Sequence, residues 1–510
     1  MKYPFLFFLF ISITAVHQLE SQYLNATVLD SSNQQPIPYA TVQLNEKGVI
    51  TNEDGNFRFT LDETIKETDS IIISCIGYER MAKPLSQFKT ARISLIPRAI
   101  ELKEVIVSNK NYTADEIMAL VEDNLEKNYS NDLTKKRLFH RTSSFDRWIK
   151  SDFKVKKSSI PILNQHFLDS VIASVPKNNS YYSEIVGDLY GNYSKETQKL
   201  DLLKASKLFD KSKELDAEKL EEKFNEILKD NVKQGSYFKI KSGLFGTKVN
   251  AEEVSEYLED EVDSTDVAAV NKQLAERKKN KEEEQKNYAE WKRTDLAKIL
   301  SHLPTQEDTD LNFITKSRKY DFTLTEFTYL GNDAVYLIKF QPSGSSDFEG
   351  TLYINADDFA LIQVDYTNVK PVKKFNVLGV SSNKYLSKGK IIFNKGIDGT
   401  YALRYFESET GTKIGLKRPL KIIEKNKIVK GRNKQNELSG AMDFVFINVN
   451  KNELIVFESE SISQAYYDAF IENNAISPTY MPKYDPNFWK GYAIMEPNTA
   501  IKEFSSASSK

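Results

Sequence analysis

Cysteine, histidine and a net charge of either sign are nearly absent from this sequence. Its 510 residues include one cysteine, Cys75, and four histidines. A single cysteine cannot form an intramolecular disulfide, so the fold has to be stabilised by packing. The 70 Lys and Arg residues are balanced by 72 Asp and Glu, which leaves a net charge of −2. Nucleic acid is therefore not expected as a partner, because its binding relies on a basic surface.

Common catalytic motifs are also missing. The sequence has no Gly-x-Ser-x-Gly turn, no Gly-x-x-x-x-Gly-Lys-Ser/Thr loop and no Gly-x-Gly-x-x-Gly turn. His140, His166 and His302 are followed by "RTS", "FLD" and "LPT", so none begins the His-x-x-Glu pair of a zinc carboxypeptidase, and Asp169 in "HFLD" is only a weak ligand. We predict no catalytic residue, metal or cofactor, and favour a protein that is not an enzyme. A carboxylate pair for glycoside hydrolysis stays open.

Long apolar runs are missing except at the start of the chain. Lys2 precedes "PFLFFLFISITAV", which is too short to span a bilayer comfortably and is typical of a secretory signal. We predict a signal peptide over residues 1–22, cleaved near Ser21 and Gln22 or else kept as an anchor. The protein is then exported, and periplasmic or associated with the outer membrane. No later run reaches the length of a transmembrane helix, so none is expected in the mature chain.

Residues 23–98 have the pattern of a small all-β sandwich. The runs "YLNATVLD", "YATVQL", "GNFRFTL", "SIIISCIGYE" and "ARISLIP" alternate apolar and polar residues and are separated by turn residues. This alternation places Phe57 and Phe59 inside. The stretch "TNEDGNF" has part of the spacing of a calcium loop, but an EF-hand with its glycine at 55 needs Glu where Leu61 stands. We interpret it as a hairpin turn in which Gly55 supplies the positive φ.

Three motifs in this sandwich, "PIPYATV", "DGNF" and "IGYE", point to a family. They resemble the carboxypeptidase-like regulatory domain, a transthyretin-type sandwich at the N-terminus of many exported and outer-membrane proteins. The resemblance implies a sandwich fold and no peptidase chemistry of its own.

The segment "ELKEVIVS" follows the sandwich directly. It is similar to the stretch that follows the same sandwich in TonB-dependent outer-membrane receptors, which implies partner contacts at Glu104, Val105, Ile106 and Val107. The rest of the chain is too short for the roughly 22-strand barrel of such a transporter. The alternative is an extended linker over residues 99–112.

The remaining chain predicts an α+β body. Thr113 and Glu116 have capping-box spacing ahead of an apolar stripe, and residues 195–300 are rich in Lys and Glu. These features predict an α-rich region over 113–310 with a charged helical insertion. Strand patterns predict an antiparallel sheet over 311–455, and a helix and an aromatic tail follow over 456–510. The fold class is thus multidomain, a transthyretin-like sandwich followed by an α+β body.

One strand pair suggests a ligand site. "GTLYINADDFALIQVDY" carries apolar side chains on both faces and loosely resembles the ladder of curved half-barrels that carry lipoproteins or acyl chains. We predict that Tyr353, Phe359 and Leu361 bind an apolar or acyl ligand if one face stays uncovered. The alternative is a sheet covered on both sides.

These observations favour a non-enzymatic envelope protein. Its sandwich would dock to a partner, such as another envelope protein, and its body would bind a ligand or protein. Two alternatives stay open, an accessory of TonB-linked uptake and an envelope hydrolase acting on peptide or glycan.

Overall fold

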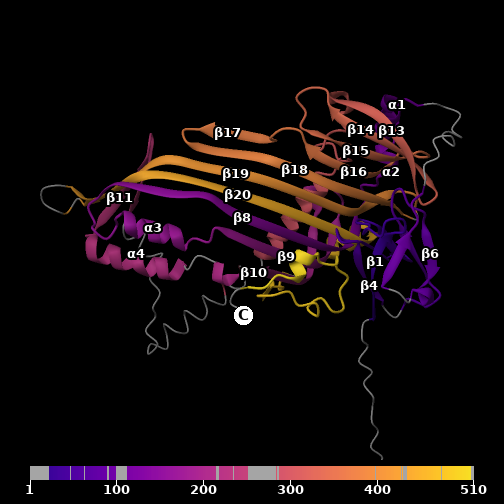
Figure 1. The fold of residues 1–510 in the computed structure, drawn as a ribbon, viewed down its shortest axis with the longest axis horizontal. Helices are drawn as coiled ribbons and strands as arrows, with labels where there is room; N and C mark the ends of the chain where they lie inside the picture. Colours follow the sequence, from indigo (N-terminus) through magenta and orange to yellow (C-terminus); the bar gives the residue numbers. More distant parts are fainter. Residues whose placement is uncertain are drawn as a thin grey trace, which may run out of the picture.

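In the computed structural model, the sandwich lies beside one end of a long, twisted sheet (Figure 1). The structure describes residues 22–506, apart from 46, 62–63, 89–90, 99–111, 214–216, 234, 251–278, 280–282, 284–286, 397, 427, 429–432 and 473. The predicted signal peptide therefore lies almost wholly outside the described residues, and so do Glu104, Val105, Ile106 and Val107.

The N-terminal domain is a two-sheet β-sandwich, as the sequence predicted. One sheet has the order β4-β1-β7 and the other β3-β2-β5-β6. Phe57 and Phe59 are 1% and 3% exposed, so the predicted inward face of β4 is confirmed. The strands are β1 (Gln22–Asp30), β2 (Thr41–Leu44), β3 (Lys47–Ile50), β4 (Asn56–Leu61), β5 (Ser70–Ser74), β6 (Met81–Pro84) and β7 (Arg92–Leu95).

The "TNEDGNF" stretch is a turn, but it is not a hairpin. β3 pairs with β2 whereas β4 pairs with β1, so the stretch crosses from one sheet to the other. The Asn52 side chain accepts hydrogen bonds from the backbone N–H groups of Asp54 and Asn56, at 3.0 and 2.9 Å. Gly55 has φ +72°, and a Cβ there would lie 2.7 Å from the carbonyl oxygen of Val28. Glycine is therefore required both by the conformation and by the close approach.

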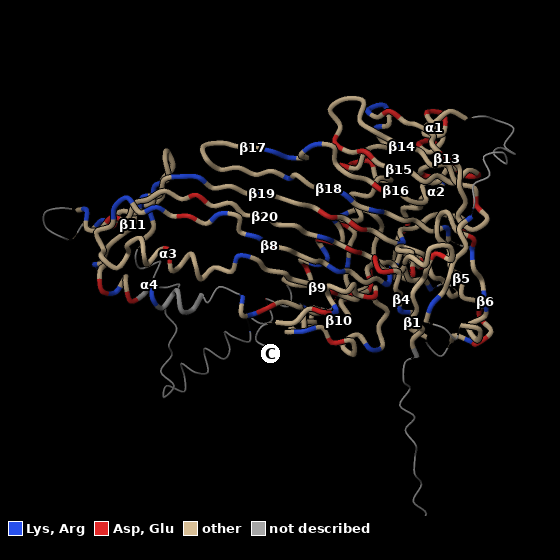
Figure 2. The backbone as a smooth tube through the Cα atoms, in the orientation of Figure 1, with Lys and Arg blue, Asp and Glu red and all other residues tan. Residues whose placement is uncertain are grey.

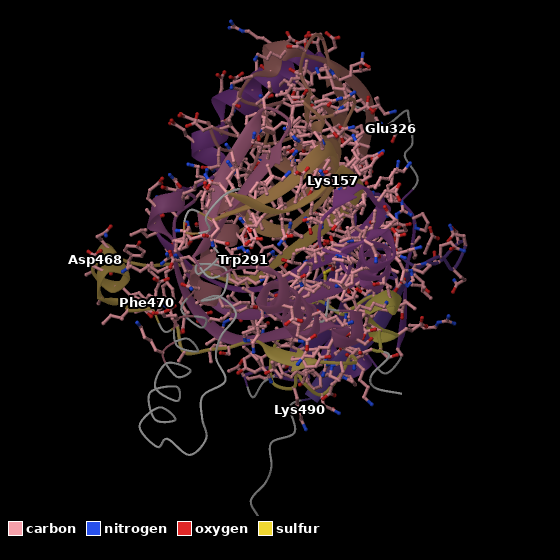
Figure 3. The ribbon with its side chains drawn as sticks, turned by 90° about the vertical axis from the view of Figure 1, so that its left-hand side faces the viewer. Lys157, Trp291, Glu326, Asp468, Phe470 and Lys490 are labelled. Atoms are coloured by element: carbon pink, nitrogen blue, oxygen red, sulfur yellow. The ribbon has the colours of Figure 1, made fainter. Side chains whose placement is uncertain are left out.

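The body is built on one 14-stranded sheet. Its main order is β13-β14-β15-β16-β18-β19-β20-β8-β9-β10-β21, with β11 and β17 added beside β19 and β18, and β12 paired with β11. Seen along the strands, Glu326 of β13 and Phe470 lie at opposite sides of the molecule (Figure 3). The strands are β8 (Thr134–Ser158), β9 (Asn178–Gly191), β10 (Lys199–Phe209), β11 (Ser236–Ser242), β12 (Phe245–Asn250), β13 (Tyr320–Leu330), β14 (Asp333–Pro342), β15 (Phe348–Asn355), β16 (Leu361–Asn368), β17 (Lys373–Val377), β18 (Val380–Lys395), β19 (Tyr401–Asn426), β20 (Lys434–Ser461) and β21 (Thr479–Met481).

Among the described residues, helices are fewer than the sequence suggested, and much of the predicted charged helical insertion lies outside those residues. The region 113–310 was expected to be α-rich, but it supplies β8 to β12, and β8 alone has 25 residues. The capping box is present: Thr113 is the N-cap of the first helix and Glu116 returns the hydrogen bond. The labelled helices are α1 (Ala114–Asp123), α2 (Leu125–Asn128), α3 (Gln165–Ser174), α4 (Ala217–Asn231), α7 (Gln464–Ala469) and α8 (Thr499–Lys502). A further helix spans 287–301.

The long strands have two differently covered faces. On β20, Leu454 and Val456 pack in a core with residues of α1 and of the helix 287–301, and we call this side the helical face. Ile455 and Phe457 point the other way and pack with the sandwich and Trp489, on what we call the sandwich face. Both covers sit over one end of the long strands, which we call the near half. The far half extends away from the sandwich (Figure 1).

A buried polar cluster fixes the sandwich to the near half. Lys451 of β20 pairs with Glu53 of the sandwich and lies 3.2 Å from Glu407. Arg141 is almost fully buried and its Nε donates to Glu184 at 2.6 Å. Burial alone would lower the pKa of Lys451, but Glu453 and Glu407 raise it above its ordinary value. The sandwich is thus held on the body by charge pairs as well as by apolar packing.

Candidate apolar binding surface

Two rows of side chains, apolar except for Ser382, cross the far half of the sheet on the helical face. Residues directly opposite each other on neighbouring strands project to the same side, so strand register defines each row. The first row is Phe375, Ser382, Ile414, Phe446 and Trp148, and the second is Val377, Val380, Leu416 and Phe444. We call these nine residues the apolar strip. It crosses β17, β18, β19, β20 and β8, a distance of roughly 20 Å at about 4.8 Å per strand spacing.

The strip belongs to the same face as the helical core. Side chains along a strand alternate between faces, and β20 pairs with β19 in unbroken register from Gly440 to Ile455. Phe444 and Phe446 therefore share a face with Leu454, which is fully buried under the helices. Farther along, Leu438 shares this face and packs against residues of α3 and α4. The apolar strip thus lies between two sets of helices that pack on this face.

The apolar strip contains a cavity that is lined wholly by apolar side chains. It measures about 360 Å³ and is lined by Trp148, Ile414, Leu416, Phe444 and Phe446. The Trp148 ring lies 5.0 Å from the Phe446 ring and 6.2 Å from the Phe444 ring, measured between centroids. These edge-on and tilted contacts are favourable ring geometries, and the three rings form part of the cavity lining.

Exposure of the strip is unusual for residues of this kind. Ile414 is 45% exposed, Phe375 50% and Val377 60%. Single exposed apolar side chains are normal on a protein surface, but a contiguous set marks an interaction site. The strip meets this condition because its members are adjacent across five strands.

A polar row borders the strip on the side nearer the sandwich. Lys373, Lys384, Thr412, Asn448 and Asp146 stand opposite one another on the same five strands. Asn448 donates to Asp146 at 2.7 Å, so this end of the row is internally paired. Burial lowers the pKa of Lys384, and Lys298 and Lys373 add to that effect. Figure 2 shows the basic segment at the start of β17.

The residues predicted to bind a ligand lie in the near part of the body. Leu361 is fully buried in the helical core. Phe359 adopts φ +58° in the turn before β16, and its ring meets Tyr112 edge-on at 5.6 Å. Tyr353 is half-buried, and burial together with Asp365 raises its pKa. Their role in ligand binding stays a prediction, and none of the three belongs to the apolar strip.

Sequence reasoning did not single out the strip. One signal was available in "AMDFVFINVN", where Met442, Phe444 and Phe446 alternate with polar or smaller residues. The strands that meet there come from positions as distant as 148 and 446, so the row exists only once register is known. Sequence alternation reveals that a strand has an apolar face but not whether another element covers it.

The histidines do not assemble a metal centre in the described part of the chain. No group of three or more His, Cys, Asp or Glu side chains converges among those residues. His140 is buried in the near half, and burial lowers its pKa to about 3, with Lys292 adding to the shift. Within the same described residues, no helix is both long enough and apolar enough to cross a membrane.

Fold and surface together define a two-domain, β-rich protein with a partly exposed apolar strip on its large sheet. The CarboxypepD_reg-like domain family model matches residues 25–107. The N-terminal sandwich is therefore a domain of that family, as its motifs indicated. No curated protein sequence matches the chain.

Two solved structures are similar to this chain at low levels. A LolA superfamily protein from Nitrosomonas europaea matches at 9% identity and a TM-score of 0.16, covering 70% of this chain and 98% of its own. A DUF1329 family protein from Desulfovibrio piger matches at 9% identity and a TM-score of 0.18, with the same coverage. At these scores the similarities carry no argument about function.

Proposed function

We propose that the protein is an exported, non-enzymatic binding protein that holds a chain-like apolar ligand, of the acyl-chain type, on the apolar strip. The observation that carries the proposal is the wholly apolar cavity of about 360 Å³, lined by partly exposed aromatic and aliphatic side chains. Ligand pockets for small molecules fall in this size range and are lined mainly by apolar and aromatic groups.

The shape of the strip favours a chain over a globular partner. It is two side chains wide and roughly 20 Å long, with a polar row along one border. A stable protein–protein interface usually buries at least about 1,000 Å² in total, which calls for a broader patch. An extended hydrocarbon chain can cover a long, narrow strip while its polar end reaches the bordering row.

The compartment is part of the proposal. The apolar segment after Lys2 supports export, and a CarboxypepD_reg-like domain at the N-terminus fits that location. Fractionation should find the mature chain in the periplasm or with the outer membrane, with an N-terminus near Gln22. A full-length cytoplasmic product would contradict export without touching the binding proposal.

Binding can be measured with a fatty acid that carries an environment-sensitive dansyl group. Saturable enhancement of dansyl fluorescence is expected, together with a change in the emission of Trp148, which lines the cavity. Ile414→Glu should weaken binding at least tenfold, because it puts a charge on the floor of the cavity. Since Ile414 is 45% exposed, the variant should still fold.

Leu244→Glu is the matched control. Leu244 is 90% exposed in the turn between β11 and β12, also in the far half, and does not line the cavity. It should bind the probe like the unaltered protein. The proposal fails if the folded protein shows no saturable binding, or if Ile414→Glu and Leu244→Glu behave alike.

A further inference from the structure

A second cavity, distinct from the apolar strip, lies where the sandwich meets the near half of the body. It measures about 380 Å³, and its walls include Gln43 and Asn45 of the sandwich and residues of β8, β19 and β20. Hydroxyl and amide groups are frequent in these walls, among them those of Tyr193, Thr400 and Ser459. The cavity therefore suits a polar ligand.

Three cations line this cavity, and one of them, Lys395, pairs with Asp358. Lys136 is 3% exposed, and its Nζ donates to the carbonyl oxygen of Gly191 at 3.2 Å and to the Thr134 hydroxyl. Arg404 donates from Nη1 to the carbonyl oxygens of Val456 and Phe457, both at 2.7 Å. All these acceptors are uncharged, so hydrogen bonds to them hold the cationic groups in place without neutralising them.

The carboxylates of the cavity wall leave Lys136 without a counter-charge. Asp398 accepts from the backbone N–H and hydroxyl of Thr400, at 3.0 and 2.9 Å. Glu458 lies 3.8 Å from Lys47 and only partly offsets the burial that lowers the pKa of Arg404 to about 10. For Lys136, burial acts alone and lowers its pKa to about 7. Buried charges are normally paired, so an uncompensated lysine in a cavity wall is the feature that a bound anion would explain.

We infer that this cavity binds an oxyanion group, such as a phosphate or sulfate, on a polar molecule. Lys136, which is almost fully buried, supplies one charge in the cavity wall, and Arg404 supplies another. The surrounding hydroxyl and amide groups supply donors for the remaining oxygens. Gln43 and Asn45 come from the sandwich, so the site is complete only when the two domains are packed together.

Titration calorimetry of the full chain with sodium sulfate, against sodium chloride at equal ionic strength, tests the inference. Saturable sulfate binding is expected. Lys136→Met should weaken it at least tenfold. Ser459→Trp, which changes an exposed wall residue and fills the mouth of the cavity, should do the same without altering a buried charge. The second variant keeps the test valid if Lys136→Met fails to fold.

Lys292→Met is the matched control. Lys292 is also buried, at 1% exposed, and does not line this cavity. Sulfate binding should survive in this variant. Absence of saturable binding to the unaltered protein would overturn the inference, and so would sulfate binding in Lys136→Met and Ser459→Trp that is as tight as in the unaltered protein.

Two further probes distinguish a free anion or soluble ester from a lipid headgroup as the bound oxyanion. Inorganic phosphate that binds with the same dependence on Lys136 indicates a free anion or a soluble ester. Co-sedimentation with phosphatidylglycerol vesicles, but not with phosphatidylcholine vesicles, that is lost in Lys136→Met indicates a lipid headgroup. If neither probe depends on Lys136, the site does not bind phosphate groups and the inference is wrong.

Discussion

The near and far halves of the long strands share one alternation of side chains but differ in what covers them. On the helical face of the near half, Leu138, Phe406 and Leu454 are at most 6% exposed under α1 and the helix 287–301. On the same face of the far half, Ile414 is 45% exposed. The apolar pattern of a strand therefore creates the possibility of a core, and the rest of the chain decides whether that face becomes a core or a binding surface.

On the sandwich face, ion pairs in the near half are buried and an ion pair in the far half is exposed to solvent. In the near half, Arg141 and Lys451 lie among Glu184, Glu407 and Glu453 beneath the sandwich. In the far half, Lys150 pairs with Asp443, and both side chains keep partial contact with solvent. Buried pairs lose far more than exposed ones when one partner is removed. Variants placed at equivalent positions in the two halves test this difference in burial.

The largest effect is expected for Arg141→Met in the near half. The change leaves Glu184 and Glu453 buried without their shared cation, which should cost about 3 to 5 kcal/mol of unfolding free energy. Lys150→Met in the far half should cost much less, because its pair with Asp443 is exposed to solvent. Urea unfolding measures both. Similar losses in the two variants would contradict the contrast.

A smaller difference is expected for two leucines on the helical face. Leu454→Ala removes a fully buried side chain and should cost about 2 to 5 kcal/mol. Leu416→Ala, on the neighbouring strand in the far half, lines the open cavity and should cost about 1 kcal/mol or less. The same unfolding measurement applies. A large loss for Leu416→Ala would show that an element covers the strip in solution, and would argue against an open binding surface.

The pH dependence of stability should reflect His140 of the near half. Burial lowers its pKa to about 3 in the folded protein, against about 6.5 in an unfolded chain. Above pH 6.5 the imidazole is neutral in both states, so it adds no pH dependence. Below pH 6.5 the unfolded state takes up the proton and the folded state does not, so stability falls by up to about 1.4 kcal/mol per pH unit.

Unfolding of His140→Gln and of the unaltered protein between pH 7 and 5 isolates this contribution. The variant should lose less stability over that range. His166→Gln changes an exposed histidine on α3 of the far half. This variant should lose as much stability between pH 7 and 5 as the unaltered protein. Equal pH slopes in all three proteins would mean that His140 is accessible to protons in the folded state.

Much of the N-terminal domain could be read from the sequence. Its motifs are local, so the sandwich, the inward Phe57 and Phe59 and the capping box of Thr113 and Glu116 follow from neighbouring residues. Errors arose where pairing was remote. "TNEDGNF" was expected to be a hairpin, but its flanking strands pair with other strands, and a turn sequence does not record which sheet each flank will join.

The candidate sites were harder to predict for the same reason. The sequence predicts a site at Tyr353, Phe359 and Leu361 because their strands are apolar on both faces, yet Leu361 is fully buried in the helical core. Trp148 and Phe446 lie about 300 residues apart in sequence and touch only through the β8–β20 register. Lys136 and Arg404 likewise line one cavity only because β8, β20 and β19 are consecutive in the sheet.

By itself the sequence determined the secondary structure of its locally patterned segments, the family of its first domain and the absence of common catalytic motifs, because each of these depends on residues close together in the chain. Only the tertiary structure decided that the expected α-rich region contributes β8 to β12, that the apolar strip stays partly exposed between two sets of helices, and that Lys136 is buried without a counter-charge among the described residues. Burial and charge compensation are properties of three-dimensional neighbours. Sequence spacing does not encode them, which is why both candidate sites became visible only in the fold.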